Sequence, residues 1–167
     1  NESASGLANV YSAKAKVYDA KSEYYTAYIY YMKALETRLL APNPDNSVVY
    51  LGAGYNQVGY AYLQRKEYNE AKKYLIKGKN HRLNKRGLKH PDLAYSFNGL
   101  SRCSFEQGYF TEAITYSDSV LISLNYTTTK DLEKVFDLNS LLNALETRAK
   151  YFYQEYLHSQ SDSFLIK

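Results

Sequence analysis

The chain has 167 residues, of which 45% are hydrophobic, a formal net charge of +4, twenty tyrosines and no tryptophan. This length and apolar content are enough to bury one core, and no apolar run approaches the ~18 residues that a membrane-spanning helix needs. The single cysteine, Cys103, excludes a disulfide within the chain and favours a reducing compartment. We therefore expect a cytoplasmic protein with no membrane contact.

Helical periodicity of apolar residues, interrupted by turn and cap signals, predicts seven helices. A further cap signal at 161–163 predicts that another helix begins at Phe164. The fold class expected from this pattern is all-α. The predicted ranges, in chain order, are 4–19, 23–40, 47–64, 68–84, 91–107, 110–125 and 131–158.

The chain contains an internal repeat. Ala27, Ala71 and Ala113 occupy one column of it and are 44 and 42 residues apart, and the same offsets relate five further columns. Regular self-similarity at this period is typical of a solenoid, in which stacked helical hairpins bury a continuous core. We expect one domain with repeats at about 4–46, 47–90, 91–130 and an incomplete fourth at 131–167, as part of a longer array whose last apolar face is exposed.

Small residues stand where the two helices of a repeat should cross. Gly59 lies on the apolar stripe before the turn and Ala71 on the stripe after it, so the two helices can approach closely there. Together with Val58 and Tyr62, these residues resemble the tetratricopeptide repeat family. The usual period of that family is ~34 residues, and the longer period here resembles its kinesin-light-chain-type subclass.

The resemblance implies a right-handed superhelical solenoid of stacked antiparallel helical hairpins. It also implies a protein-protein interaction scaffold that binds an extended peptide or protein segment in its concave groove. The segment 143–150 additionally resembles the last repeats before the caspase-like (CHAT) domain of some bacterial proteins. That second resemblance leaves open a regulatory or recognition arm of a larger enzyme or sensor, such as a cysteine peptidase or sensor kinase, whose catalytic domain lies outside this sequence.

In the family, the first helix of each hairpin lines the groove. An Asn amide there can hold the backbone of an extended peptide, and Arg or Lys selects carboxylates, which predicts an acidic partner. The simpler alternative is that these polar residues only form the solvated face of amphipathic helices. The candidate groove residues carried over from the resemblance are Lys16, Asn56, Tyr60, Tyr95, Asn98, Arg102 and Lys150.

The sequence lacks the residue patterns of catalytic and metal sites. Cys103 is expected to be a buried structural thiol, since free cysteine is among the most buried residue types. The histidines His81, His90 and His158 lie in three different repeats. No Cys-x-x-Cys pair and no phosphate-binding loop after a strand occurs. We therefore predict no enzyme activity, no metal and no cofactor.

A basic run ends the second repeat, and it contains Lys77, Lys79, Arg82, Lys85, Arg86 and Lys89. One interpretation is a phosphate-binding patch, and the other is a group of cations that complement a helix C-terminus. No aromatic stacking platform is interleaved with the run, which favours the second interpretation. Nucleic acid is therefore not the expected partner, whereas oligomerisation through the open C-terminal face stays open.

Overall fold

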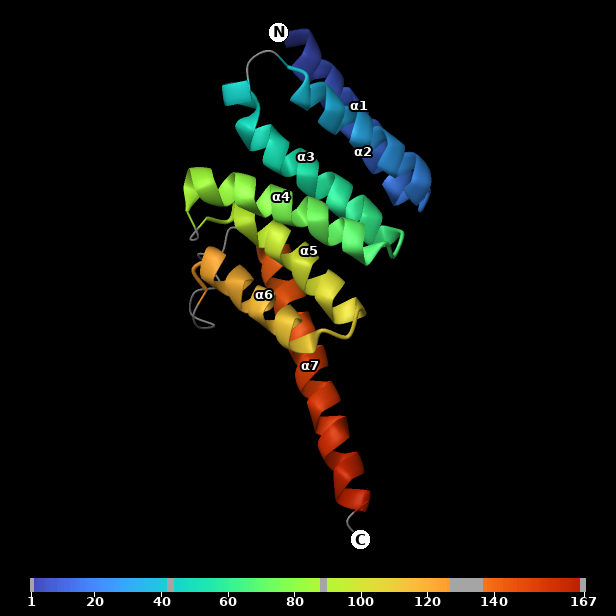
Figure 1. Cartoon of the computed structure of the whole chain (residues 1–167), viewed down its shortest axis with the longest axis vertical. Coiled ribbons are helices and arrows are strands. Elements are labelled where there is room, and N and C mark those ends of the chain that lie inside the picture. The colour runs from blue at the N-terminus through green and yellow to red at the C-terminus, as the bar shows by residue number, and fades with distance from the viewer. Residues whose placement is uncertain (1, 42–43, 88–89, 127–136, 166–167) are drawn as a thin grey trace.

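The computed structural model describes residues 2–41, 44–87, 90–126 and 137–165. These residues form seven α-helices and no strand, which confirms the all-α class (Figure 1). The first six helices begin and end within three residues of their predicted bounds. The helices are α1 (Glu2–Ala20), α2 (Tyr24–Leu39), α3 (Pro44–Gln64), α4 (Tyr68–Arg86), α5 (Asp92–Glu106), α6 (Phe110–Ser123) and α7 (Leu138–Leu165).

The bounds of the last helix differ from the prediction. Helix α7 runs without a break from Leu138 to Leu165, so the predicted cap at 161–163 and the new helix at Phe164 are wrong. Serine and aspartate inside a helix cost less than 1 kcal/mol each relative to alanine, whereas starting a new helix requires a costly nucleus. Extension of an existing helix is therefore favoured. The first six residues of the predicted range, 131–136, lie outside the described residues.

The turns inside the three hairpins have the same backbone conformation. Ser22, Lys66 and Gly108 are the left-handed residues of these turns, with φ of 63°, 60° and 80°, and they are 44 and 42 residues apart. In the first turn the Glu23 amide donates to the Tyr18 carbonyl at 2.9 Å, and the equivalent bonds of the other two turns measure 3.0 and 2.8 Å. Such bonds satisfy carbonyls that a helix end would otherwise leave unpaired. The hairpin turns thus repeat at the offsets found in the sequence.

Consecutive helices pack against one another along the whole chain. Helices α1 and α2, α3 and α4, and α5 and α6 form the hairpins, and α3 and α5, as well as α5 and α7, also touch directly. The fully buried Leu75 of α4 fills the space left by two glycines: a Cβ on Gly59 of α3 would lie 2.7 Å from Leu75 Cγ, and one on Gly99 of α5 would lie 2.7 Å from Leu75 Cδ2. The predicted close approach at Gly59 is confirmed.

The buried apolar residues that the structure describes gather in two clusters. One lies between the first two hairpins and includes Tyr31, Leu35 and Val58. The other joins the second hairpin to the third hairpin and to α7, around Leu75, Leu100 and other buried residues. Tyr62 packs against both clusters, because it lies at the end of α3 between them.

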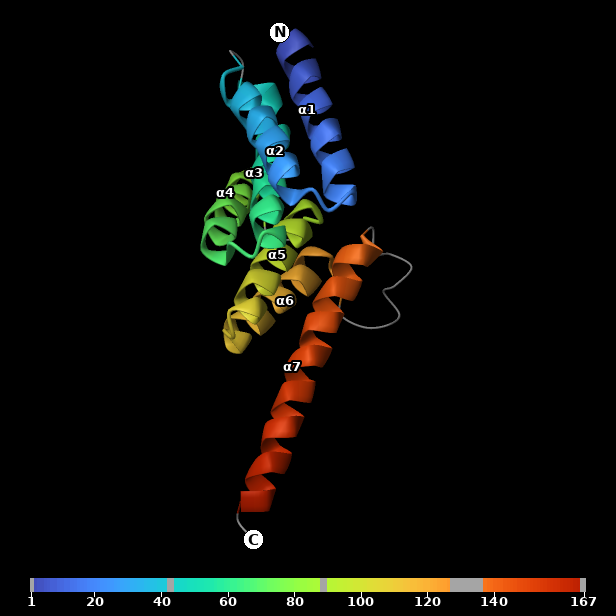
Figure 2. The same ribbon diagram turned by 90° about the vertical axis from the view of Figure 1, so that its right-hand side faces the viewer.

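The C-terminal part of α7 extends away from the other helices (Figures 1 and 2). Several apolar side chains along α7 are open to solvent: Leu142 is 61% exposed, Phe152 55% and Tyr153 61%. An apolar face on the last helix was expected to be exposed, and it is.

Candidate functional site

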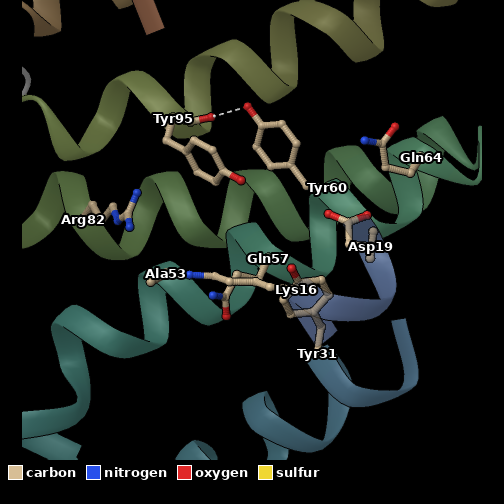
Figure 3. A pocket seen from close by; sticks show the side chains of 10 residues that line it. Lys16, Asp19, Tyr31, Ala53, Gln57, Tyr60, Gln64, Arg82 and Tyr95 are labelled. Atoms are coloured by element: carbon tan, nitrogen blue, oxygen red, sulfur yellow. Dashed lines mark hydrogen bonds between the residues drawn. The ribbon is translucent and has the colours of Figure 1, made fainter. Parts of the chain in front are cut away.

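A cavity of about 440 Å³ opens on the side of the molecule where α1, α3 and α5 present their side chains (Figure 3). We call it the Tyr60–Tyr95 cavity. Helices α2 and α4 each contribute one residue to it. It is lined by Lys16, Asp19, Tyr31, Ala53, Gln57, Tyr60, Ala61, Gln64, Arg82 and Tyr95.

Two stacked tyrosines form one wall of this cavity. The rings of Tyr60 and Tyr95 lie 4.3 Å apart between centroids with 22° between their planes, and Tyr60 Oη donates to the Tyr95 carbonyl at 3.0 Å. Gly99 leaves room for this pair, since a Cβ there would lie 3.1 Å from Tyr60 Cε2. Burial raises the pKa of both phenols, that of Tyr95 to about 12, so both are neutral at physiological pH. The wall is therefore aromatic with hydroxyl groups at its edge.

Charged groups lie at both ends of the cavity. Figure 3 shows Lys16 extending toward Ala53 and Gln57, whereas the Asp19 carboxylate lies at the end nearer Gln64. Burial raises the pKa of Asp19. Arg82 also lines the cavity and donates a hydrogen bond to the Asp92 carbonyl at the start of α5.

Two further hollows continue along the first helices. One of about 300 Å³ shares Arg82 and Tyr95 with the Tyr60–Tyr95 cavity. The other, of about 340 Å³, lies between α5 and α7, and we call it the Arg102 hollow. In it Lys150 pairs with Glu146 at 2.7 Å, and the hydrogen bond from Lys150 lowers the pKa of Glu146. The Arg102 hollow is lined by Arg102, Phe105, Glu106, Asn143, Glu146, Thr147 and Lys150.

Five of the seven predicted groove residues line these hollows. Lys16, Tyr60 and Tyr95 share the Tyr60–Tyr95 cavity, and Arg102 and Lys150 share the Arg102 hollow. The structure thus brings together residues that lie up to 79 positions apart in the first set, from 16 to 95. Whether they bind a peptide stays a prediction.

The two asparagines do not face an open groove, so this part of the prediction is corrected. Asn56 is 0% exposed and Asn98 is 2% exposed. Asn56 Nδ2 donates to Ser96 Oγ at 2.8 Å, and Asn98 Nδ2 donates to the Ser140 carbonyl at 3.0 Å. Each amide therefore joins the first helix of its hairpin to the next first helix, α3 to α5 and α5 to α7.

Asn56 and Asn98 are buried because their column of the repeat points toward the next first helix and not toward solvent. The equivalent residue of the first repeat, Ser12, is also buried and donates to Gln57 of α3 at 3.3 Å. Ser12, Asn56 and Asn98 are 44 and 42 residues apart, like the core columns. A polar residue that recurs in a stack of repeats can hydrogen-bond either to the next repeat or to a ligand. Burial shows that these residues bond to the next repeat.

The residues of the Tyr60–Tyr95 cavity that were not predicted from the sequence include Gln57, Gln64, Tyr31 and Arg82. Gln57 and Gln64 were detectable, because with Tyr60 they share one helical face at spacings of three and four. Tyr31 and Arg82 come from second helices, which the family pattern does not place on the groove. Only the packing of α2 and α4 brings these two side chains there.

Two features of the described part of the chain concern metal binding and nucleophilic chemistry. No group of three or more His, Cys, Asp or Glu side chains there could hold a metal ion. Cys103 is 0% exposed, and burial raises the pKa of its thiol to about 12, so the prediction of a buried structural thiol is confirmed.

The basic run has aromatic neighbours that its sequence did not indicate. The Lys77 amine lies 5.3 Å from the ring centroid of Tyr74 and 5.9 Å from that of Tyr55. The side chains of Lys85 and Arg86, and all of Lys89, lie outside the described residues. Among the helices described, none is long and apolar enough to cross a membrane.

Comparison with known proteins gives a likeness of fold only. No family model matches the chain, and no curated protein matches its sequence. Among solved structures, the chain is similar to the crystal structure of BtubC (BKLC) from P. vanneervenii, with a TM-score of 0.65 and 16% sequence identity over 94% of this chain. The chain spans 62% of the length of that structure. At this identity the likeness shows an all-helical fold of the helical-repeat type.

Proposed function

We propose that this chain is a protein-interaction module that binds an extended peptide or protein segment along its first helices. The observation that carries the proposal is the succession of hollows from α1 to α7. The first two share Arg82 and Tyr95, and Arg102 lies seven residues, or two turns, beyond Tyr95 on α5. A compact small molecule needs one cavity, whereas an extended chain advances by ~3.3 Å per residue and can enter several in turn.

The proposal includes a right-handed superhelix of the tetratricopeptide type, close to the kinesin-light-chain subclass. The repeating columns, the three equivalent turns and the likeness to BtubC support it. In such an array the first helices face inward, which agrees with the position of the hollows. A partner segment would then contact several hairpins at once.

The composition of the hollows fits recognition of peptide side chains. The Tyr60–Tyr95 wall provides a flat apolar surface with low conformational entropy, as aromatic residues do at interfaces. Lys16, Arg82 and Arg102 add hydrogen-bond donors with a positive charge. An acidic or amphipathic segment is therefore the preferred ligand.

Selection from a displayed library of random linear peptides, with the folded chain as bait, tests the proposal. Peptides that are enriched should lose at least about tenfold in affinity for Tyr95→Ala, since central aromatic residues dominate interface energies. Arg102→Ala should weaken the binding of longer peptides that reach the Arg102 hollow. Tyr25→Ala is the matched control, because Tyr25 of α2 is 64% exposed and lines none of these hollows.

Circular dichroism of each variant should match that of the original chain, since Tyr95 is 42% exposed and Arg102 lies at the surface. If no peptide is enriched, or if enriched peptides bind Tyr95→Ala and Tyr25→Ala equally well, the groove is not a peptide site.

A further inference from the structure

A buried guanidinium that pairs with no carboxylate of the described residues lies behind the Tyr60–Tyr95 cavity. Arg38, near the end of α2, is 7% exposed. Its Nη2 donates to Ser12 Oγ at 3.0 Å and to Asn9 Oδ1 at 3.3 Å, and its Nη1 donates to Gln57 Oε1 at 3.4 Å. All three acceptors are neutral. No aspartate or glutamate in the described ranges forms a salt bridge with Arg38.

A buried charge is costly unless an opposite charge and hydrogen bonds compensate it. Burial accordingly lowers the pKa of Arg38. The hydrogen bonds to neutral groups engage both Nη atoms of Arg38, but no carboxylate of the described residues balances its positive charge. Gln57 both accepts from Arg38 and lines the Tyr60–Tyr95 cavity, so the charge of Arg38 lies next to that space.

Arg38 also determines which atom Gln57 presents to the cavity. Gln57 Oε1 is directed at Arg38 and Ser12, which leaves the amide Nε2 as the donor for the opposite side. Lys16 lies one turn after Ser12 on α1, and its side chain extends toward Gln57 in Figure 3. At this end of the cavity an amide donor and an ammonium group therefore converge, with Asp19 at the other end.

Two glycines of α3 make room for arginines on either side of Ala53, which lines the cavity. A Cβ on Gly52 would lie 2.9 Å from Arg82 Cγ, and a Cβ on Gly54 would lie 3.2 Å from Arg38 Nη1. Larger residues at these positions would displace both guanidinium groups. The Gly-Ala-Gly sequence at 52–54 thus allows two positive charges to lie against one segment of α3.

We propose that the Lys16–Gln57 end of the Tyr60–Tyr95 cavity binds an anionic group, a carboxylate or a phosphate, of the ligand. Lys16 and the Gln57 amide contact the anion, and Arg38 is a positioning residue that orients Gln57 and supplies the long-range positive charge. The inference rests on the proposed peptide-binding function for the source of the anion, but the anion site can be measured without any peptide.

Gln57→Glu gives a test with two opposite effects. A carboxylate at this position supplies a counter-ion for Arg38, so the melting temperature should rise by about 2–4 °C. The same change replaces a donor by a negative charge at the anion site, so binding of an anion should fall at least about tenfold. If Arg38 and Gln57 only hold the hairpins together, stability rises and anion binding stays unchanged, which overturns the proposal.

Gln64→Glu is the matched control, because it adds the same charge to the same face of α3, two turns away, at the Asp19 end of the cavity. It should not raise the melting temperature and should weaken anion binding less than Gln57→Glu. Lys16→Met keeps the apolar stem of an exposed side chain and removes the charge. This change should weaken anion binding about tenfold and leave the melting temperature unchanged.

The binding measurement is a titration of the ¹⁵N-labelled chain with sodium phosphate, sodium acetate and, at matched ionic strength, sodium chloride. Saturable amide shifts near Lys16 and Gln57 with phosphate or acetate, but not with chloride, support the site, and the better of the two anions identifies its chemistry. Absence of a saturable shift with either anion overturns it. Enriched peptides that bind Lys16→Met as well as the original chain would refute the anion site while leaving the peptide groove intact.

Discussion

Asn56 of α3 and Ser96 of α5 hydrogen-bond to each other in both directions, with Asn56 Nδ2 to Ser96 Oγ at 2.8 Å and Ser96 Oγ to Asn56 Oδ1 at 3.1 Å. Both side chains are 0% exposed. A buried polar pair of this kind fixes the register of two helices, because any other register leaves both groups unpaired. The pair therefore specifies how the second hairpin stacks on the third.

Asn56→Ala should lower the free energy of unfolding by about 1–3 kcal/mol, because Ser96 then loses its buried partner. Asn80→Ala is the control, since Asn80 is exposed on α4 and its replacement should change stability by less than about 0.5 kcal/mol. Urea denaturation followed by circular dichroism measures both values. Equal midpoints for the two variants would show that the Asn56–Ser96 pair contributes nothing.

Gly78→Ala should destabilise the chain although alanine is the better helix former. A Cβ on Gly78 would overlap Asn56 Oδ1, which Ser96 holds in place. Gly6→Ala in α1 offers the matched control, because nothing lies within 4 Å of a Cβ there. Gly6→Ala should stabilise the chain by up to about 1 kcal/mol, whereas Gly78→Ala should cost about 1–3 kcal/mol.

In the double variant Asn56→Ala with Gly78→Ala, the new Cβ at position 78 no longer meets Asn56 Oδ1, because that oxygen is removed as well. The cost of the double variant should therefore be smaller than the sum of the two single costs, as is usual for residues in contact. Strict additivity in thermal or urea unfolding would show that the two positions do not touch.

Acid stability should depend on Glu112. Burial alone would raise the pKa of its carboxyl, but hydrogen bonds from Lys72 at 2.5 Å and from Ser104 at 2.7 Å lower the pKa on balance. A lowered folded-state pKa gives stability that is present above the ordinary value of 4.5 and is lost as the pH falls through the lowered value.

Glu112→Gln should therefore be less stable than the original chain at pH 7, and the difference should shrink as the pH is lowered below about 4. Glu106→Gln, on the exposed end of α5, is a control that should alter the profile less. Melting temperatures measured across this pH range check the trend, and parallel profiles for Glu112→Gln and the original chain would contradict it.

The Cys103 thiol should be unreactive in the folded chain. It is 0% exposed, and burial raises its pKa to about 12, so almost no thiolate exists at pH 8. Reaction with 5,5′-dithiobis(2-nitrobenzoate) at pH 8 should be slow in buffer and fast in urea, with a rate that follows the fraction unfolded. Rapid stoichiometric labelling in buffer would show that the site around Cys103 opens without global unfolding.

Much of the fold could be predicted from the sequence because it depends on local pattern. The helix ranges, the offsets of 44 and 42 residues and the close approach at Gly59 all follow from spacing along one chain. The end of α7 was predicted wrongly, since the weak cap signal at 161–163 competes with the low cost of extending a formed helix. The left-handed conformation of Ser22 and Lys66 was not predicted, because glycine, which usually marks such a position, is absent from both.

By itself, the sequence determined the all-α class and the repeat, because helical periodicity assigns each side chain to a face. The five residues that line the hollows were carried over from the family resemblance. Only the tertiary structure decided which polar faces are buried between hairpins. Asn56 and Asn98 have the same sequence signal as a groove residue, but they are buried where α5 and α7 pack against their helices. In the sequence Arg38 is an ordinary cation. The packing of α1 and α3 around it makes it a buried charge that no carboxylate of the described residues pairs with. Burial depends on neighbours far apart in the chain, which no spacing rule within one helix can report.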